Sequence, residues 1–545
     1  MKKWFLPIIS GIFLILSYPP FSLKFLPFFA LLPLFFFLNF KNKGPAREAS
    51  GRMRWVGCSL KKSFLAGFLT GLIFLGGIMF WFFDVFPLDW VGIDINILGF
   101  FILFFSWFLT ILISSSFIGL FSLGYIFFSR RNFWDILLVP SLWVIFEYLR
   151  AWSFGFLWWG KESLLGPHWT FGNLAYSLVQ NQNFKSISSI GGIYLVSFLL
   201  ILINILLFIL IKKIIKTDLP LNRIVYFLII LGIVGLISAT YFFSFSKKID
   251  EKNQKLEIAV LQTQIPSFFR SSEETLKEKF QIQQQLLEEA LQLHPSLDII
   301  VFPEGANFLR QENSKKILAE HSFQKETFII DSASIGSFEG IKSIATFYST
   351  QKGSLAHYQK ILLSPVGEYL PYILEVPAEI INKKWVKKFE RTRGQKRGQE
   401  LIVFSGANGW RGGIFFCSET LSSNFHREIA DKGAEIFFNL GSLSFSHGSK
   451  NLDSQTQAML QFRAAENGKY LVRATNYGSS YIINENGEII KKTPNFENQV
   501  LFGKVSPISK KTPYTTYGDW VLILAGFILL TFCFFVLRYK KQIDL

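Results

Sequence analysis

The sequence predicts a polytopic α-helical membrane domain of about eight transmembrane helices, joined to one extracytoplasmic α/β domain. Three observations lead to this fold class. Half of the 545 residues are hydrophobic and 62 of them are phenylalanine, a composition too apolar for a wholly soluble chain. Long apolar runs alternate with basic segments in residues 1 to 245. From Leu256 onward, short apolar runs alternate with helical stretches, which is typical of layered α/β domains.

Apolar runs long enough to cross a bilayer, which takes roughly 20 residues, define the membrane part. The first two runs are short, and the first lacks a small-residue cleavage site, so we expect it to remain as an anchor. We predict a transmembrane domain over 1–245, an external catalytic domain over 246–518, and a last transmembrane helix with a short cytoplasmic tail over 519–545. The predicted spans are residues 4 to 17, 25 to 40, 62 to 83, 97 to 128, 133 to 150, 191 to 211, 224 to 245 and 520 to 537.

The net charge of +17 follows from the predicted membrane topology. Basic residues such as Lys41, Lys43 and Arg47 fill the loops on one side, whereas residues 84 to 94 on the other side contain Asp but no Lys or Arg. By the positive-inside rule, the N-terminus is cytoplasmic and residues 246 to 518 are outside. Because topology accounts for the charge, we expect no nucleic-acid partner.

Short β-branched or apolar runs predict the strands of the external domain, and two stretches predict helices. The first helix opens with a capping box from Ser271 to Glu274 and carries Leu276 and Leu287 on its apolar face. The second helix covers residues 454 to 467. The predicted strands are Leu256 to Gln262, Leu297 to Phe302, Thr327 to Ser332, Ser343 to Tyr348, Gly412 to Phe416, Ile436 to Asn439, Leu471 to Ala474 and Ser480 to Ile483.

Residues 370 to 389 interleave apolar side chains with lysines, as in Ile380-Ile-Asn-Lys383-Lys-Trp385. This pattern fits two arrangements. The segment packs on the external domain, or it dips an apolar face into the bilayer surface with its lysines among the headgroups. We favour the second arrangement.

Of the three cysteines, only Cys417 is placed to do chemistry. Cys58 lies in a basic segment and Cys533 in the last apolar span, whereas Cys417 follows the strand-like run Gly-Gly-Ile-Phe-Phe of the external domain. A lone thiol at this place is a candidate nucleophile. With one cysteine in the external domain, no disulfide can form within it, so its core must hold the fold.

Two charged residues are predicted to join Cys417 at strand ends, where the active sites of α/β folds gather. Glu304 follows Asp298-Ile-Ile-Val-Phe-Pro, and Lys360 ends His357-Tyr-Gln-Lys. A thiol needs a base or a nearby positive charge to become a thiolate, so Glu304 suits the first role and Lys360 the second. Lys360 is also suited to stabilise an oxyanion. Taken singly, such residues are more often solvated surface groups or inert buried thiols.

The segments around these three residues resemble the nitrilase superfamily of carbon-nitrogen hydrolases, whose catalytic Glu, Lys and Cys occur in this order. The matching segments are Phe302-Pro-Glu-Gly, Lys360 with Pro365-Val-Gly-Glu-Tyr-Leu-Pro, and Cys417-Ser-Glu. Within the superfamily, the chain is similar to the apolipoprotein N-acyltransferase family of bacterial inner membranes. The stretches that extend this resemblance over nearly the whole chain are Tyr18-Pro-Pro-Phe, Glu147-Tyr-Leu-Arg, Gly155-Phe-Leu-Trp, Gly191-Gly-Ile-Tyr, Arg463-Ala-Ala-Glu, Arg473-Ala-Thr-Asn-Tyr-Gly and Thr512-Pro-Tyr-Thr-Thr-Tyr-Gly-Asp-Trp.

The resemblance implies an αββα sandwich for the external domain and ping-pong acyl transfer. In that mechanism Glu304 is the general base, Lys360 stabilises the oxyanion, and Cys417 forms a thioester with an acyl chain from a phospholipid donor. The acceptor is the α-amine of a diacylglyceryl-cysteine at the N-terminus of an apolipoprotein. The resemblance also implies a multi-pass monomer of the bacterial inner membrane, with its catalytic domain on the periplasmic side and with neither cofactor nor metal.

Some features keep two interpretations. Glu368 and Glu419 match further carboxylates that the family places at the site, but they equally suit ion pairs that hold Lys360 and a loop. The aromatic segment from Ala151 to Trp169 suits a lipid-facing entrance, or an ordinary belt of interfacial aromatic residues.

The chain departs from the family pattern at three places. The first strand ends in Gln262-Thr-Gln264-Ile-Pro where Gln-Gly-Asn is usual, and Ser418 replaces the usual tyrosine. The stretch from Asn439 through Leu443 lacks the family's Asn-Asp-Ala-Trp-Phe-Gly. The triad is intact but substrate contacts differ, so a paralogue that acylates another amine is an alternative.

Other functions compete with this one. A membrane-tethered amidase would use the same triad and pass the acyl group to water, but the many spans favour transfer. A transporter is disfavoured because the spans have almost no ionisable residues at their centres, and Glu147 and Arg150 near a span end need only a local pair and snorkelling. A papain-like protease is disfavoured because no histidine lies in a recognisable motif.

Overall fold

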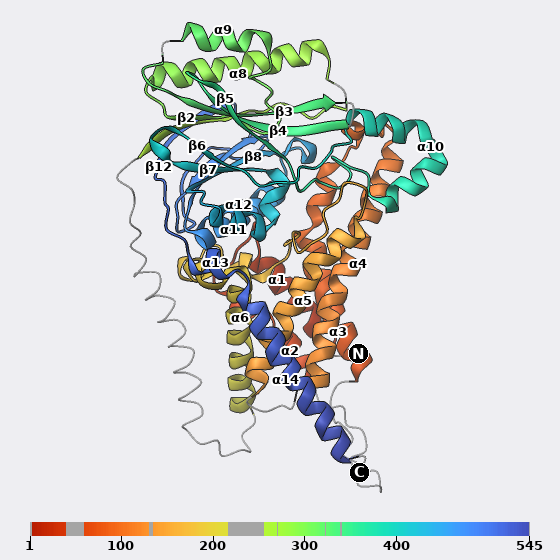
Figure 1. The fold of residues 1–545 in the computed structure, drawn as a ribbon. Helices are drawn as coiled ribbons and strands as arrows, with labels where there is room; N and C mark the ends of the chain where they lie inside the picture. Colours follow the sequence, from red (N-terminus) through yellow and green to blue (C-terminus); the bar gives the residue numbers. More distant parts are fainter. Residues whose placement is uncertain are drawn as a thin grey trace.

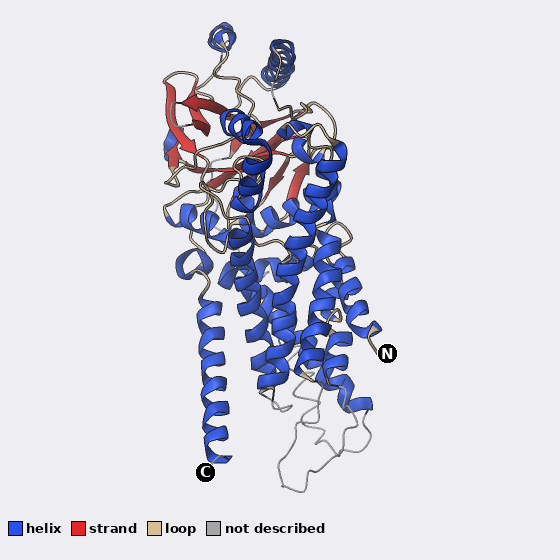
Figure 2. Cartoon of the chain, turned by 90° about the vertical axis from the view of Figure 1, so that its right-hand side faces the viewer, coloured by secondary structure: helices blue, strands red, loops and turns tan. Residues whose placement is uncertain are grey.

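The computed structural model describes residues 3–39, 59–129, 134–215, 255–269, 271–321, 323–337 and 340–543. A bundle of helices forms the lower part of the molecule, and two β-sheets with their covering helices form the upper part (Figures 1 and 2). Both chain termini lie on the bundle side, away from the sheets (Figure 1). The molecule is thus a β-sandwich standing on a helical bundle.

The bundle consists of apolar helices that match most of the predicted spans. Among the described residues, four segments are long and apolar enough to cross a membrane, namely Leu60–Val85, Asn96–Phe128, Asp135–Leu157 and Gln182–Lys212. The helices are α1 (Phe5–Ser17), α2 (Leu32–Leu38), α3 (Leu60–Ile78), α4 (Asn96–Phe128), α5 (Asp135–Leu157), α6 (Gln182–Ile215) and α14 (Trp520–Ile543). The short helices η2 (Phe80–Val85), η3 (Asp89–Val91) and η4 (Leu174–Leu178) lie in the connections.

The predicted span at residues 25 to 40 is wrong as a single helix. This segment forms the short helix η1 (Leu26–Phe28) and then α2. Each starts with a proline in its first turn, a place where the missing N–H of proline is tolerated. α2 has 7 residues and rises only about 10 Å, against a bilayer core of about 30 Å. The predicted span at 224 to 245 and the domain boundary after 245 lie outside the described residues, so the total of eight spans stays a prediction.

The upper part is a sandwich of two six-stranded sheets, ordered β12-β1-β2-β3-β4-β5 and β11-β10-β9-β8-β7-β6. β1, β2 and β3 run parallel, as do β7, β8 and β9, so each trio ends at one edge of its sheet. The strands are β1 (Leu256–Gln262), β2 (Ile299–Val301), β3 (Phe328–Ser337), β4 (Gly340–Ser349), β5 (Gly353–Gln359), β6 (Val403–Ser405), β7 (Arg411–Phe416), β8 (Ile436–Ser442), β9 (Tyr470–Asn476), β10 (Tyr481–Ile483), β11 (Ile489–Lys492) and β12 (Gln499–Val505).

Each predicted strand overlaps an observed one, but the prediction omits β5, β6, β11 and β12. These four are the edge strands of the two sheets. An edge strand has a partner on one side only and carries more exposed side chains, as β5 and β11 do. The apolar pattern of these edge strands is therefore weak, and for this reason the sequence does not predict them.

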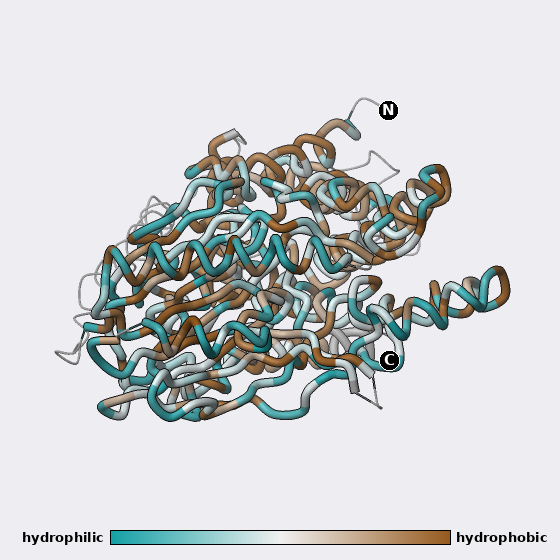
Figure 3. The backbone as a smooth tube through the Cα atoms, turned by 90° about the horizontal axis from the view of Figure 1, so that it is seen from above, coloured by the Kyte–Doolittle hydropathy of each residue, from teal (hydrophilic) through white to brown (hydrophobic). Residues whose placement is uncertain are grey.

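Alternate residues of the inner strands face two different cores, which gives the predicted αββα layers. On β1, Ile258 and Val260 face the space between the sheets, whereas Ala259 and Leu261 belong to the core under the covering helices. Seen from above, the mostly hydrophilic α8 lies over hydrophobic strands (Figure 3). The first sheet is covered by α8 (Glu273–Leu293) and α9 (Glu312–Glu320), and the second by α11 (Ser423–Asp431) and α12 (Lys450–Asn467) on the bundle side (Figure 1).

The N-terminus of α8 differs from its prediction by one residue. Ser272 is the N-cap, and its Oγ accepts a hydrogen bond from the backbone N–H of Thr275 at 3.1 Å. The predicted capping box of Ser271 and Glu274 is therefore wrong. Leu287 is fully buried, as expected for the apolar face, but Leu276 is 41% exposed.

The lysine-rich segment forms α10 (Tyr372–Thr392), which projects from the side of the molecule (Figure 1) and is kinked at Asn382. After the kink, Val386 and Phe389 are buried in a cluster with Trp90 of η3. Before the kink, apolar side chains are exposed, and Ile380 is 82% exposed. Packing on the protein is therefore correct for the second half. For the first half, immersion in a bilayer surface stays a prediction.

Glu147 and Arg150 of α5 have a different role from the one predicted. Both are buried, so neither snorkels. A carboxylate oxygen of Glu147 accepts the N–H of Leu174 at 2.7 Å, and Arg150 donates to the carbonyl of Phe171. The pair therefore fixes the loop from 171 to 174, which follows the aromatic segment and leads into η4.

Replacing Leu287 by alanine tests the assigned core under α8. We expect the free energy of unfolding to fall by about 2–5 kcal/mol, because a buried leucine leaves a cavity. The matched control is Leu276→Ala in the same helix, which should change it by less than about 0.5 kcal/mol. The measurement is denaturant unfolding of the full-length protein in detergent. Equal losses in the two variants would contradict the assignment.

Candidate active site

Glu304, Lys360 and Cys417 come together at the strand ends, as predicted. Glu304 follows β2, Lys360 follows β5, and Cys417 follows β7. Backbone hydrogen bonds fix the first two: the N–H of Glu304 donates to Gly441 O at 3.4 Å, and that of Lys360 to Ser343 O at 3.0 Å. All three line one cavity between the sandwich and the bundle.

Lys360 lies between two carboxylates. Its Nζ is 2.8 Å from Oε1 of Glu304 and 2.7 Å from Oε1 of Glu368, and its side chain is only 2% exposed. Burial alone would lower the pKa of Lys360, but the two glutamates outweigh it and hold this pKa above its usual range. Lys360 is therefore a fixed cation.

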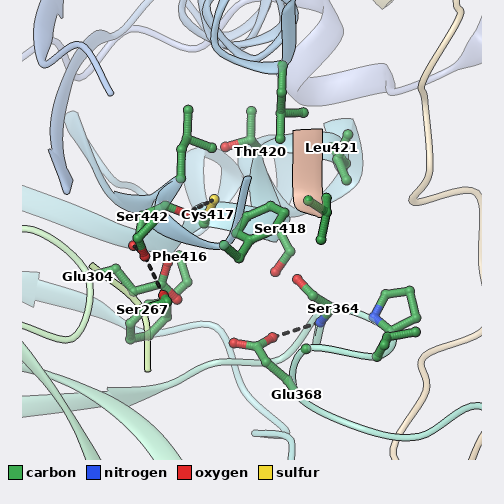
Figure 4. Close-up of a pocket in the computed structure, with 18 of the residues that line it drawn as sticks. Ser267, Glu304, Ser364, Glu368, Phe416, Cys417, Ser418, Thr420, Leu421 and Ser442 are labelled. Atoms are coloured by element: carbon green, nitrogen blue, oxygen red, sulfur yellow. Dashed lines mark hydrogen bonds between the residues drawn. The ribbon is translucent and has the colours of Figure 1, made fainter. Parts of the chain in front are cut away.

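Glu368 braces both Lys360 and a turn of the chain. Its second carboxylate oxygen accepts the N–H of Ser364 at 2.7 Å, as Figure 4 shows, and its first also accepts from Nε2 of Gln395 at 3.3 Å. The sequence left open whether Glu368 acts directly or holds Lys360. Its contacts match the holding role, although its carboxylate also lines the cavity.

Cys417 starts the short helix η6 (Cys417–Leu421), directly after β7. Its Sγ lies 3.6 Å from the carbonyl oxygen of Ser442, to which the thiol donates (Figure 4). Burial raises the pKa of Cys417, Glu304 raises it further, and the positive charges of Arg473 and Lys360 oppose the rise. Burial also raises the pKa of Glu304, against the effect of Lys360. The thiol therefore holds its proton more tightly than a free cysteine does, and the affinity of the Glu304 carboxylate for a proton is increased as well.

Glu419 is fully buried and holds two strand ends together. One oxygen accepts from Tyr358 Oη at 2.7 Å and from the N–H of Ile361 at 2.7 Å, while the other accepts the N–H of Phe416 at 2.7 Å. These donors flank Lys360 and Cys417. Glu419 is thus a clamp between the β5 and β7 ends, the holding role that the sequence had left open, made by hydrogen bonds instead of an ion pair.

The cavity has about 330 Å³ of space and both charged and apolar lining residues. The charged site residues Glu304, Lys360 and Glu368 line it together with Cys417. Much of the apolar lining comes from the bundle and its loops, including Trp81, Phe82, Leu103, Phe154, Trp158 and Trp169. Three of these lie in the segment from 151 to 169, so part of that segment lines the cavity, and its role as a lipid-facing entrance stays a prediction.

Two of the three departures from the family pattern are at the cavity wall. Ser418 and Leu443 line it, and the Ser418 hydroxyl donates to the carbonyl of Leu362. Gln264 does not line the cavity; its backbone N–H donates to Asn498 Oδ1 at 2.7 Å. Ser418 and Leu443 therefore border the space that a substrate would occupy.

Sequence reasoning gave no role to Arg473, although the chain around it was noted. It lies on β9, is fully buried, and acts electrostatically on Cys417. The sequence does contain a feature that points to Arg473, because it is a single charged residue within the apolar run Tyr470-Leu-Val-Arg-Ala. Among the described residues, no group of three His, Cys, Asp or Glu side chains is arranged to hold a metal ion.

Two family models match the chain. The one described as apolipoprotein N-acyltransferase N-terminal domain matches residues 10–206, and the one described as carbon-nitrogen hydrolase matches residues 257–509. The chain is 25% identical over 505 residues to the apolipoprotein N-acyltransferase of Geobacter metallireducens, covering 89% of this chain and 85% of that protein. It is 28% identical over 431 residues to that of Wigglesworthia glossinidia brevipalpis, covering 75% and 77%. Nit3 of Saccharomyces cerevisiae, a member of branch 10 of the nitrilase superfamily, is a solved structure similar to 48% of this chain and 93% of its own, with a TM-score of 0.36 and 13% identity.

Replacing Glu419 by glutamine tests the clamp. A glutamine has one acceptor oxygen, so its NH₂ must face a buried N–H or hydroxyl donor. We expect a loss of about 1–3 kcal/mol in the free energy of unfolding, together with a changed rate of Cys417 alkylation by iodoacetamide. The control is Glu428→Gln on the exposed face of α11, which should behave as wild type. Wild-type stability in the Glu419 variant would refute the clamp.

Proposed function

Because the chain belongs to the apolipoprotein N-acyltransferase family, we propose that it moves an acyl chain from a phospholipid to the N-terminal amine of an apolipoprotein whose cysteine carries a diacylglyceryl group. One observation carries this proposal. The cavity that contains the thiol continues into apolar and aromatic residues of the membrane bundle. Such a wall suits an acyl chain better than a small polar amide.

A phospholipid donor does not readily leave the bilayer, and the acceptor is itself anchored by lipid, so the site has to open toward the membrane. The cavity supports this, because residues of both the sandwich and the bundle line it. We place the protein in the bacterial inner membrane with the sandwich on the periplasmic side. The basic loops of the sequence support that orientation through the positive-inside rule.

In the first half-reaction, Glu304 takes the proton of Cys417, and the thiolate attacks the ester carbonyl carbon of the phospholipid. A carbon–sulfur bond forms, and the Lys360 ammonium stabilises the oxyanion. The ester carbon–oxygen bond then breaks, and the lysophospholipid alcohol leaves with the proton held by Glu304. Cys417 remains as a thioester.

In the second half-reaction, the α-amine of the acceptor attacks the thioester carbon. Glu304 takes a proton from the attacking nitrogen and Lys360 again faces the oxyanion. The carbon–sulfur bond breaks, the amide is released, and the thiolate recovers a proton from Glu304. The raised pKa of Glu304, caused by burial, suits a group that must hold and return a proton.

An amidase would send the same thioester to water. The two activities differ in what reaches the thioester, and an apolar wall disfavours water. The family models and relatives support transfer, so hydrolysis is not favoured.

The thioester is directly testable. Full-length protein in lipid nanodiscs that contain phospholipid with a labelled acyl chain should acquire a label on Cys417 that hydroxylamine removes. Cys417→Ala should carry no label, whereas Cys533→Ala, in the last helix, should label normally. Addition of a diacylated lipopeptide should move the label to its amine. A wild-type protein without label would refute the mechanism, and release of the label only as free fatty acid would favour the amidase.

Glu304→Gln tests the general base. Loss of a positioned base lowers the rate by about 10²–10⁴-fold, so we expect labelling of Cys417 to slow within that range. The control is Glu320→Gln, whose side chain is 63% exposed on α9. Labelling at the wild-type rate in Glu304→Gln would assign the base to another group.

A further inference from the structure

The charged groups on the cavity side of Cys417 do not favour a thiolate. Lys360 is bound by both Glu304 and Glu368, so one positive charge faces two negative charges. When all three are ionised, this cluster is net negative and opposes a further negative charge on sulfur. A further cation on the protein side of Cys417 would favour the thiolate.

Arg473 is a cation in that position. It lies on β9, and β8 separates β9 from β7, the strand that ends at Cys417. Its guanidinium is fully buried. Nη1 donates to Oδ1 of Asn439, the residue of β8 that pairs with Arg473 in the sheet, at 2.6 Å. The guanidinium lies 5.8 Å from the ring of Tyr481.

The charge of Arg473 is not neutralised by an acid in contact with it. Within the described part of the chain, no carboxylate lies within 4.0 Å of its guanidinium, and Asp453 of α12 acts on it from farther away. Its Nε and Nη2 have no oxygen or nitrogen acceptor among these residues. A buried guanidinium is costly unless it is paired with a negative group. Besides Asp453, the titratable groups that act on this guanidinium are Tyr481 and the Cys417 thiol, and Cys417 acts on it more strongly than Asp453 does.

Gly441 makes room for this arrangement. A Cβ at position 441 would lie 2.8 Å from Nη2 and 2.9 Å from Cζ of Arg473. The carbonyl of Gly441 accepts from the N–H of Glu304, and the next carbonyl, of Ser442, accepts from the Cys417 thiol. The guanidinium therefore packs against Gly441, whose carbonyl binds the Glu304 N–H and whose neighbour Ser442 binds the Cys417 thiol.

We propose that Arg473 is the counter-charge of the Cys417 thiolate. It is a positioning residue that stabilises the thiolate from within the sheet, whereas Lys360 stabilises the substrate oxyanion from the cavity side. This inference rests on the proposed function in taking Cys417 as the nucleophile. The two cations then have separate roles, because Lys360 faces the cavity and Arg473 lies within the sheet. The proposal also explains why a charged residue interrupts an apolar strand.

The electrostatics agree with this division. Arg473 and Lys360 both lower the pKa of Cys417, against burial and Glu304, which raise it. Burial also raises the pKa of Tyr481, so its ring stays neutral beside Arg473. The titratable groups that face Cys417 or Arg473 are Glu304, Lys360, Asp453 and Tyr481.

The test measures the thiol itself. Full-length protein in nanodiscs is treated with iodoacetamide between pH 7 and 10.5, and alkylation of the Cys417 peptide is followed by mass spectrometry. Arg473→Gln should raise the apparent pKa of Cys417 by about one unit and slow alkylation at pH 8 about tenfold. Arg473→Lys keeps the charge and should shift less. The other titratable groups are the same in all variants, so they do not produce the difference.

The matched control is Lys469→Met, which removes a buried basic side chain next to the same strand. Lys469 donates to the carbonyls of Ile508 and Lys510, outside the cavity, so its loss should lower stability and leave the alkylation profile of Cys417 unchanged. A wild-type profile in Arg473→Gln would overturn the proposal. Equal shifts in the Gln and Lys variants would overturn it too, because the effect would then not depend on charge.

If Arg473→Gln shows no melting transition, Gly441→Ala carries the test. It keeps Arg473 but crowds Nη2, so it should raise the apparent pKa of Cys417, and an unchanged profile would overturn the proposal. Alkylation requires neither lipid nor acceptor. Failure of acyl transfer in the wild type would therefore refute the proposed function, but the alkylation data would still show whether Arg473 lowers the pKa of Cys417.

Discussion

A chain of buried hydrogen bonds connects the turn that begins at Cys417 to the helical bundle. Nη2 of Arg463 on α12 donates to Tyr176 Oη at 2.8 Å, and Tyr176 Oη lies 2.8 Å from Thr170 Oγ1, which donates to the carbonyl of Leu421 at 2.7 Å. Since Thr170 gives its proton to Leu421, it must accept from Tyr176, so the whole chain points from Arg463 to η6. Leu421 ends the turn that Cys417 begins. These hydrogen bonds fix the position of the sandwich relative to the bundle, and the cavity that both parts line depends on that position.

The same contact fixes the bundle. Glu466 lies within 3.3 Å of Arg463, and its other oxygen accepts the N–H of Ile193 at 3.0 Å, just after the kink of α6 at Gly191 and Gly192. Removing one member of a buried ion pair costs about 3–5 kcal/mol because it leaves the other charge unpaired. The two halves of the protein therefore keep one relative position, and apolar residues of the bundle stay against the thiol.

The sequence predicts the central strands and the meeting of Glu304, Lys360 and Cys417 better than it predicts the edge strands and the supporting residues. β1 and the Cys417 turn follow from apolar runs that end abruptly, because inner strands are buried on both faces. The sequence does not predict β5, because this edge strand contains His357 and Gln359 and has no continuous apolar run. Lys360 nevertheless follows directly after it. The role of Glu419 depends on donors from three other positions, and that of Arg473 on a gap at Gly441. These roles depend on residues that are far apart in the sequence and meet only in the folded chain, so a local sequence pattern does not predict them.

The difference between a transferase and a hydrolase lies in the wall of this cavity more than in its triad. Both need a base, an oxyanion cation and a thiol, and on the proposed mechanism Glu304, Lys360 and Cys417 of the sandwich supply all three. On the proposed mechanism, the thioester has to outlast the departure of the lysophospholipid and the arrival of an amine, so water must be kept away for that interval. The sandwich provides the charged residues and part of the apolar lining, such as Phe445 and Met459, and aromatic residues from the bundle complete that lining. On the proposed mechanism, the bundle is therefore part of the active site as well as an anchor, and the contact through Arg463 and Tyr176 is made of directional hydrogen bonds that hold the two parts in one position. A purely apolar interface would hold the halves together but allow them to slide, and sliding would open the thioester to water.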